Sequence, residues 1–456
     1  MRYRNYATGL AIAFRRMALL TPALALTASY CCSKPPAKPR QAWSITTKYS
    51  YGPILEDVSR RDILLLNQIG SSGTGPQSWN VPDPKLLLRT PSGIEPLVVI
   101  PLPEWPKYQY ELPEGVAELL PGPLEFVGDG GDIVGVQGPW LVLISVSSRK
   151  EIRRVLALKD LRDFEQPKVP IPVLKSPAPG KLIDTGKTEM VAQAPLPPLL
   201  AVSPVGDRLA VAYNGPAKHW IFVYTSDLTR RLASWQVSKR VEDLCWSRDG
   251  KLFGVLYPNS YTRDNPNRKF AGRHSHIALA GAQNISIFDA ISWKERLAFA
   301  TGGYDAKAVF SPDGKLVYVI RGWRDRTGKE DIRAFSTATG KLERTIKVKA
   351  KGVRHNFAVS PDGRLIAVES YSGLGFPFIF DQPEEYLDVN AGFVILDAAT
   401  GRLLFRAKRR TSSAGSGSLP IFFTADGQML IVNFAGSNEG DAEGRILGYS
   451  LPGPHR

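Results

Sequence analysis

The sequence predicts an all-β fold, a β-propeller built from four-stranded antiparallel blades. Three observations predict it: a hairpin phrase recurs five times, a second strand–turn–strand phrase follows four of the copies, and the pair repeats about every 50 residues. Seven blades are expected, with six or eight as the alternatives. Hydrophobic residues make up 43% of the chain, enough to fill the core of such an array.

The first phrase is an apolar strand, a Ser/Thr-x-Asp-Gly turn and a second apolar strand. Its five copies begin at Leu200, Leu244, Ala308, Phe357 and Ile421. Asp-Gly between two hydrophobic runs predicts a tight hairpin, because glycine accepts the positive φ that such turns require. In the first copy Val-Gly-Asp replaces the usual turn at 205–207, which predicts a shifted turn and a bulge.

The second phrase supplies the outer pair of strands in each blade. Together with the first phrase, as in Ser-Pro-Asp-Gly at 360–363 and Asp-Ala-Ala-Thr-Gly-Arg at 397–402, it resembles bacterial WD40-like and YVTN-type propeller repeats over residues 197–451. The chain departs from true WD40 proteins in lacking the Gly-His and Trp-Asp dipeptides; Phe288, Phe335 and Leu396 stand where the tryptophan would be. The resemblance therefore implies a shape rather than a particular partner.

The ring must also be closed. A compact blade is expected over 124–158, and residues 60–115 contain strands whose order within a blade is not evident. The last blade ends after its third strand, near Leu451, and an unpaired edge there would promote aggregation. An N-terminal strand within Arg61–Ile69 is expected to pair with it. The domains expected are a targeting segment (1–32), a proline-rich linker (33–55) and the propeller (56–456).

The N-terminus has the character of an export signal. Arginines precede the apolar stretch Met17–Ala28, which is short for a membrane span but suits a signal peptide. The pair Arg15–Arg16 also admits a twin-arginine signal, which the following residues match loosely. Cys31 or Cys32 is the candidate lipidation site, although Tyr30 departs from the small residue expected before it. Export to the periplasm, to a membrane-anchored position or to the outside of the cell is expected.

The charge balance bears on partners. A net charge of +15 favours acidic partners, but the basic residues are scattered singly and in pairs along the sequence, which is also typical of ordinary soluble surfaces. A monomer that binds a protein or an anionic glycan is expected, and nucleic acid is not.

Loop lengths predict the binding face. First-to-second and third-to-fourth strand links emerge at one end of a blade and are tight turns. The long insertions (159–197, 258–283, 321–330, 371–391 and 436–444) fall at the other end, where binding loops are expected. The predicted binding residues, basic or aromatic, are Arg263, Arg268, Lys269, Arg273, His274, His276, Trp323, Arg324, Arg326, Tyr371, Phe376 and Phe380. The acidic loops that follow them leave open a second interpretation, in which neighbouring loops pair with each other.

Catalytic motifs are not evident in the sequence, and no cofactor or metal is expected. His274 and His276 would form half of a metal site, for which no third ligand is visible, and Cys245 stands alone. The favoured function is therefore an exported, non-catalytic binding or scaffold propeller. The alternative is a propeller enzyme of the lactonase or quinoprotein-dehydrogenase kind, with a metal or quinone at the channel mouth.

Overall fold

The computed structural model consists of strands and the turns between them, and its described residues contain no helix. The structure describes residues 38–47, 51–56, 63–71, 80–82, 85–90, 93–99, 123–128, 131–159, 168–178, 181–192, 198–215, 218–258, 260–263, 275–278, 283–302, 305–321, 331–348, 353–372, 389–411, 421–434 and 444–451. The predicted targeting segment (1–32), with Cys31 and Cys32, lies outside these residues. The described residues therefore include no helix that could cross a membrane.

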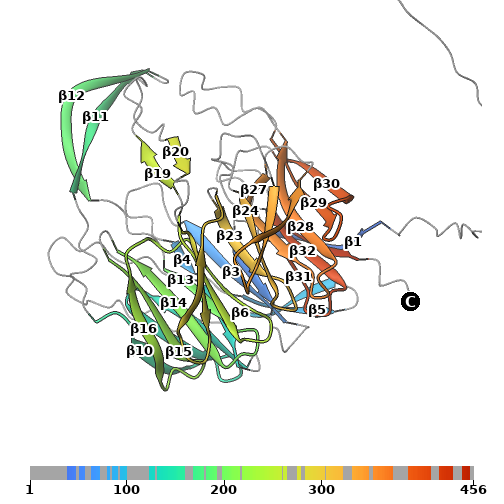
Figure 1. Ribbon diagram of the computed structural model, residues 1–456. Coiled ribbons are helices and arrows are strands. Elements are labelled where there is room, and N and C mark those ends of the chain that lie inside the picture. Colours follow the sequence, from blue (N-terminus) through green and yellow to red (C-terminus); the bar gives the residue numbers. More distant parts are fainter. Residues whose placement is uncertain are drawn as a thin grey trace, which may run out of the picture. The chain divides into compact units, whose positions relative to one another are not determined.

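Five consecutive blades each contain four antiparallel strands, which are named below from the innermost to the outermost (Figure 1). Blade 2 contains β7 (Leu124–Val127), β8 (Asp132–Gln137), β9 (Trp140–Ser145) and β10 (Glu151–Leu156), and blade 3 contains β13 (Leu199–Val202), β14 (Arg208–Asn214), β15 (His219–Thr225) and β16 (Arg231–Val237). Blade 4 contains β17 (Asp243–Trp246), β18 (Leu252–Leu256), β21 (Ile285–Asp289) and β22 (Glu295–Phe299). Blade 5 contains β23 (Asp305–Phe310), β24 (Leu316–Arg321), β25 (Asp331–Ser336) and β26 (Leu342–Lys347), and blade 6 contains β27 (Val353–Val359), β28 (Leu365–Ser372), β29 (Val389–Asp397) and β30 (Leu403–Thr411).

Two further sheets complete the set of seven blades. Blade 1 follows the path β2 (Tyr51–Glu56), β3 (Ile63–Ser71), β5 (Lys85–Thr90) and β6 (Gly93–Val99), with the short β4 (Asn80–Pro82) paired to β3. Blade 7 contains β31 (Ile421–Phe423), β32 (Met429–Phe434), β33 (Gly444–Ser450) and, outermost, β1 (Arg40–Thr47). The inner strands β7, β13, β17, β23, β27 and β31 contact one another in succession, and β2 contacts both β7 and β32. The contacts therefore form a closed cycle, and the prediction of a propeller with seven blades is confirmed.

The N-terminal strand closes the ring, but it is not the strand that was expected. β1 pairs antiparallel with β33, from Arg40 opposite Ser450 to Thr47 opposite Gly444. The run Arg61–Ile69 instead contributes to β3, which has partners on both sides, β2 and β5. The physical reason lies in composition: β1 is an outermost strand with Arg40, Gln41 and Ser44 exposed, so a polar sequence suits it. Sheet structure thus begins within the stretch 33–55 that was expected to be a linker.

The core consists of apolar layers between neighbouring blades. Along β14, Leu209, Val211 and Tyr213 pack against blade 2, whereas the alternating Ala210 and Ala212 pack toward blade 4. Successive side chains of a strand point to opposite faces, so a strand covered on both sides must be apolar throughout. Similar clusters join blade 4 to blade 5, blade 5 to blade 6 and blade 6 to blade 7. Phe288, Phe335 and Leu396, which replace the WD40 tryptophan, are all buried.

Two connections contain a hairpin of their own. β11 (Lys168–Ala178) pairs with β12 (Lys181–Ala192) between blades 2 and 3, and β19 (Ser260–Arg263) pairs with β20 (Ser275–Ala278) within blade 4. The segment 159–197 is therefore partly an ordered hairpin. Both hairpins lie in connections of the long class, on the side of the blades opposite the tight turns.

Candidate functional site

The tight-turn face is held by a repeated set of side-chain hydrogen bonds. In blade 5 the Ser311 hydroxyl donates to Asp313 at 2.6 Å, and the backbone N–H of Lys315 donates to the same carboxylate at 3.1 Å. The N–H of Leu316 donates to the Ser311 hydroxyl at 2.9 Å. These bonds lower the pKa of the Asp313 carboxyl, the bond from Ser311 contributing most. The same arrangement recurs in blades 4, 6 and 7, so the polar groups of these turns are already used within the turn.

The turn of the first copy, which follows Ser203, lacks this set of hydrogen bonds although its backbone has the usual shape. Gly206 has φ of +73° and stands three residues after Ser203, as Gly314 (φ +69°) stands after Ser311. The register of β13 with β14 is regular, so the predicted bulge is wrong. Val205 simply occupies the position of the turn aspartate, and the buried Ser203 hydroxyl consequently has no hydrogen-bond partner among the residues that the structure describes.

The inner turns of neighbouring blades also pack against one another. The N–H of Gly128 donates to the carbonyl of Gly206 at 2.9 Å, and a Cβ added at Gly206 would collide with the carbonyl of Gly128. On the other side of this turn, a Cβ at Gly250 would lie 2.6 Å from Val205. Arg248 of blade 4 reaches past blade 5 to donate to the carbonyl of Pro361 in blade 6. The tight-turn end of the inner strands is therefore filled with interlocked protein groups.

A polar layer lies toward the opposite end of the inner strands. Asp243, Lys307 and Asn356 each stand four residues before the turn serine in three successive blades. Asp243 accepts from the N–H of Ala308 at 2.9 Å, and the Lys307 ammonium donates to the Asn356 side-chain carbonyl at 3.5 Å. In blade 2, Glu125 accepts from the N–H of Val202 at 2.7 Å. Each of these two carboxyl groups thus satisfies a backbone N–H on the open edge of the next inner strand.

Burial changes the acidity of these two carboxyls. It raises the pKa of Glu125 to about 8, against the lowering effect of the Val202 hydrogen bond, and the negative charge of Asp243 adds to the rise. Burial raises the pKa of Asp243 to about 6, opposed by the charge of Lys307 and the bond from Ala308. At neutral pH Glu125 therefore retains its proton, and Asp243 is ionised beside Lys307. Both residues connect blades, and the described residues contain no group of three or more metal-ligating side chains.

The base of the long-loop face is rigid where the blade-to-blade links are described. Asn214 at the end of β14 exchanges two hydrogen bonds of 2.8 Å with the backbone of Val241. Asn284 accepts from the N–H of Thr301 at 2.8 Å and donates to its hydroxyl at 2.8 Å. The carbonyl of Thr301 then accepts from the buried Arg333. Fixed links of this kind provide a firm support for longer loops.

The structure describes three of the predicted binding residues at the level of the backbone. Arg263 ends β19 opposite Ser275, His276 pairs with Thr262 on the same hairpin, and Tyr371 pairs with Ala391 in blade 6. Arg263 and His276 are thus brought onto one two-stranded element. The others lie outside the described residues: Arg268, Lys269, Arg273, His274, Trp323, Arg324, Arg326, Phe376 and Phe380.

Glu125, Asp243 and Lys307 were not among the residues predicted from the sequence. Their signal was present: each is a charged residue with apolar neighbours on an inner strand, Leu124 and Phe126 beside Glu125 and two alanines beside Lys307. A buried charge in such a strand needs a partner. Aligning the repeats on the turn glycine would have placed Asp243 and Lys307 at one level.

Comparison with known proteins gives no functional assignment. No family model and no curated protein matches the chain. Among solved structures, hydrazine synthase of Kuenenia stuttgartiensis is 14% identical, with a TM-score of 0.46 over 70% of this chain and 75% of that one. A chain from the crystal structure of the mitotic checkpoint complex is 12% identical, with a TM-score of 0.48 over 98% of this chain and 99% of that one. At these scores neither likeness bears on activity.

Proposed function

We propose that this protein is an exported, non-catalytic propeller that binds a protein or glycan partner through its long-loop face. The observation that carries the proposal is the contrast between the two ends of the blades. At one end, tight hairpin turns are closed by their own Ser/Thr and Asp side chains, as at Ser311 and Asp313. At the other end, rigid links such as Asn214–Val241 support long connections, two of which form hairpins.

Two features of the N-terminus support export. The basic and apolar leader resembles a signal peptide, and Cys31 or Cys32 offers a lipidation site. The described part of the chain contains one free cysteine, Cys245, and no disulfide. A propeller closed by β1 and β33 needs no disulfide for stability, so the low cysteine content agrees with an oxidising compartment as well as a reducing one. The repeats belong, in this proposal, to the bacterial WD40-like or YVTN type.

Site-specific crosslinking tests which face binds. A photoreactive residue would be introduced into the full chain at Arg263 or Tyr371 on the long-loop side, and at Asp313 or Asp362 in the tight turns as matched controls. We expect a discrete crosslinked partner in the producing cell from the first pair alone. Equal crosslinking from both pairs, or from the tight turns alone, would contradict the proposal.

A further inference from the structure

The outer edges of five blades carry an excess of exposed positive charge. We define the basic rim as the fourth strands of blades 2 to 6 together with the turns that lead into them. Its exposed cations are Arg149, Lys150, Arg153, Arg230, Arg231, Lys294, Arg296, Lys341, Lys347, Arg402 and Arg406. Its exposed acids are Glu151, Asp227, Glu295 and Glu343. The basic rim therefore has eleven exposed positive charges and four exposed negative charges.

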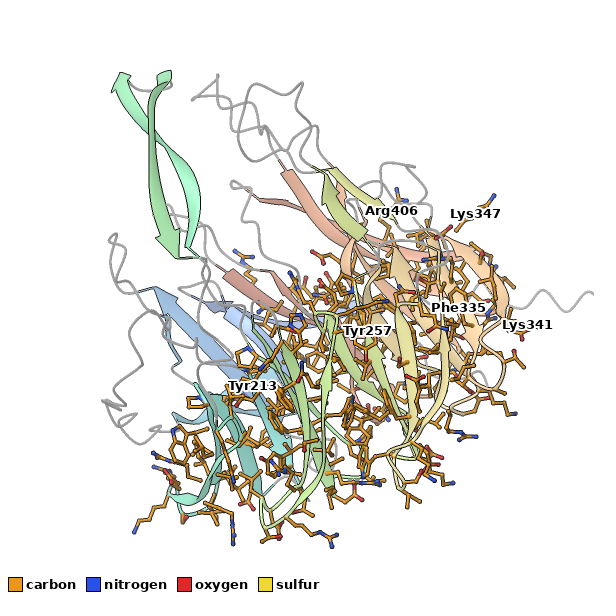
Figure 2. The ribbon with its side chains drawn as sticks, turned by 60° about the vertical axis from the view of Figure 1, so that its left-hand side comes forward. Tyr213, Tyr257, Phe335, Lys341, Lys347 and Arg406 are labelled. Atoms are coloured by element: carbon orange, nitrogen blue, oxygen red, sulfur yellow. The ribbon has the colours of Figure 1, made fainter. Side chains whose placement is uncertain are left out.

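The inner turns, on the same face of the blades, are electrically balanced. Their exposed cations in blades 3 to 7 are Arg248, Lys251, Lys315 and Arg364, and their exposed acids are Asp207, Asp249, Asp313 and Asp362. Three of these cations lie beside the aspartate of their own turn, with separations of 2.5 to 3.7 Å. The positive potential thus rises from the inner strands outward. Figure 2 shows Lys341 and Lys347 extending away from the strands.

The linear sequence hides this gathering. Each of blades 2 to 6 contributes two or three exposed cations to the rim, one from the fourth strand and the others from the turn before it, and the next contribution follows one blade later in the chain. Only the arrangement of the blades in one ring places the fourth strands together on its outer edge. The scatter that made the charge look unremarkable along the sequence is therefore a consequence of the repeat.

The need to protect the outermost strands from pairing with other sheets does not explain why the rim charges are mostly positive. A charged side chain of either sign on an outermost strand prevents edge-to-edge pairing of sheets. The rim nevertheless uses cations almost three times as often as acids, and blade 6 has Arg402 and Arg406 without an exposed acid among its described rim side chains. An excess of positive charge that recurs over five successive blades is the arrangement expected for a surface that attracts an anion.

We propose that the basic rim binds an acidic polysaccharide chain. The cations are distributed over the outer edges of five successive blades, so a flexible linear polyanion can contact several blades at once, whereas a flat surface meets only a sector. This surface is separate from the long-loop face and does not depend on the proposed function.

Binding of the full chain to immobilised dextran sulfate tests the proposal, with uncharged dextran as the blank. The rim variant combines Lys294→Gln, Lys341→Gln and Lys347→Gln. The matched control combines Lys251→Gln, Lys315→Gln and Arg364→Gln, which removes the same charge from exposed inner-turn positions. We expect the rim variant to lose about tenfold or more in affinity and to show a shallower salt dependence, because each lost contact no longer releases a counterion.

The control variant should lose less than about twofold, because its cations are paired with the aspartates of their own turns. Equal losses in both variants would show that affinity follows net charge rather than the rim, and would overturn the proposal. Absence of binding by the wild-type chain, or rim-dependent binding to anionic vesicles alone, would overturn it as well. Thermal unfolding of both variants verifies that each retains the fold. A negative result leaves the crosslinking test of the long-loop face unaffected, since the two use different residues.

Discussion

Replacing Glu125 by glutamine should stabilise the protein, and by more as the pH rises. The Glu125 carboxyl accepts a hydrogen bond from the Val202 N–H, and burial raises its pKa from 4.5 to about 8. A carboxyl whose pKa is raised on folding stabilises the fold fully below its unfolded pKa, and this contribution is lost as the pH rises through the folded pKa. Glutamine keeps the accepting oxygen and removes the titration.

The magnitude follows from the two pKa values. With a pKa of 4.5 in the unfolded chain and about 8 in the fold, the raised pKa costs about 1 kcal/mol of stability at pH 5, about 3 kcal/mol at pH 7 and about 5 kcal/mol at pH 9. Glu125→Gln should therefore raise the free energy of unfolding by amounts that grow across this range. Urea unfolding followed by the fluorescence of the nine tryptophans measures it at each pH.

Asp313→Asn is the matched control, and its expected effect on the free energy of unfolding has the opposite sign. Hydrogen bonds within the turn lower the pKa of the Asp313 carboxyl, so its ionised form is the stabilising one. This substitution should destabilise the fold by an amount that stays constant between pH 5 and pH 9. A Glu125→Gln effect that is independent of pH, or that destabilises throughout, would refute the assignment of a buried neutral carboxyl.

Three further substitutions test the packing of the turns and the closure. Gly448→Ala should weaken ring closure, because the new Cβ collides with the Trp43 indole across the sheet. In a double-mutant cycle of unfolding free energies, the loss caused by Gly448→Ala should be smaller when Trp43 is already replaced by alanine. Strict additivity of the two losses would contradict the contact. Gly206→Ala should lower the free energy of unfolding by about 2 kcal/mol more than Gly314→Ala does, as measured with denaturant. Both glycines have positive φ, but only a Cβ at Gly206 collides with a neighbouring backbone. Equal losses would count against interlocked turns. Val205→Asp should raise the unfolding free energy by about 1 kcal/mol by restoring the turn carboxylate, and a loss of stability would contradict that assignment.

The strands and turns were predictable because each repeat encodes them locally. Alternation of two buried faces makes β14 apolar throughout, and the turn glycines identify the hairpins without knowledge of the neighbours. The strand count per blade and the closed ring follow from the same pattern.

Long-range pairings were not predictable in the same way. Nothing in the local pattern of β1 distinguishes it from a polar linker, because an outermost strand needs only one partner and can expose its side chains. The carboxyl groups of Glu125 and Asp243 each accept a hydrogen bond from an N–H in the next blade, 77 and 65 residues away. The basic rim likewise exists only after the fourth strands are brought together.

The most direct test of the central claim reverses the charge of the long-loop face. The variant combines Arg263→Glu, Arg268→Glu and Arg273→Glu in the full chain, and the control places the same change on the tight-turn face at Arg248, Lys251 and Lys315. The readout is the affinity for the partner that crosslinks from position 263. We expect the long-loop variant to lose binding of an acidic partner while the control retains it; unchanged binding by the long-loop variant would contradict the claim.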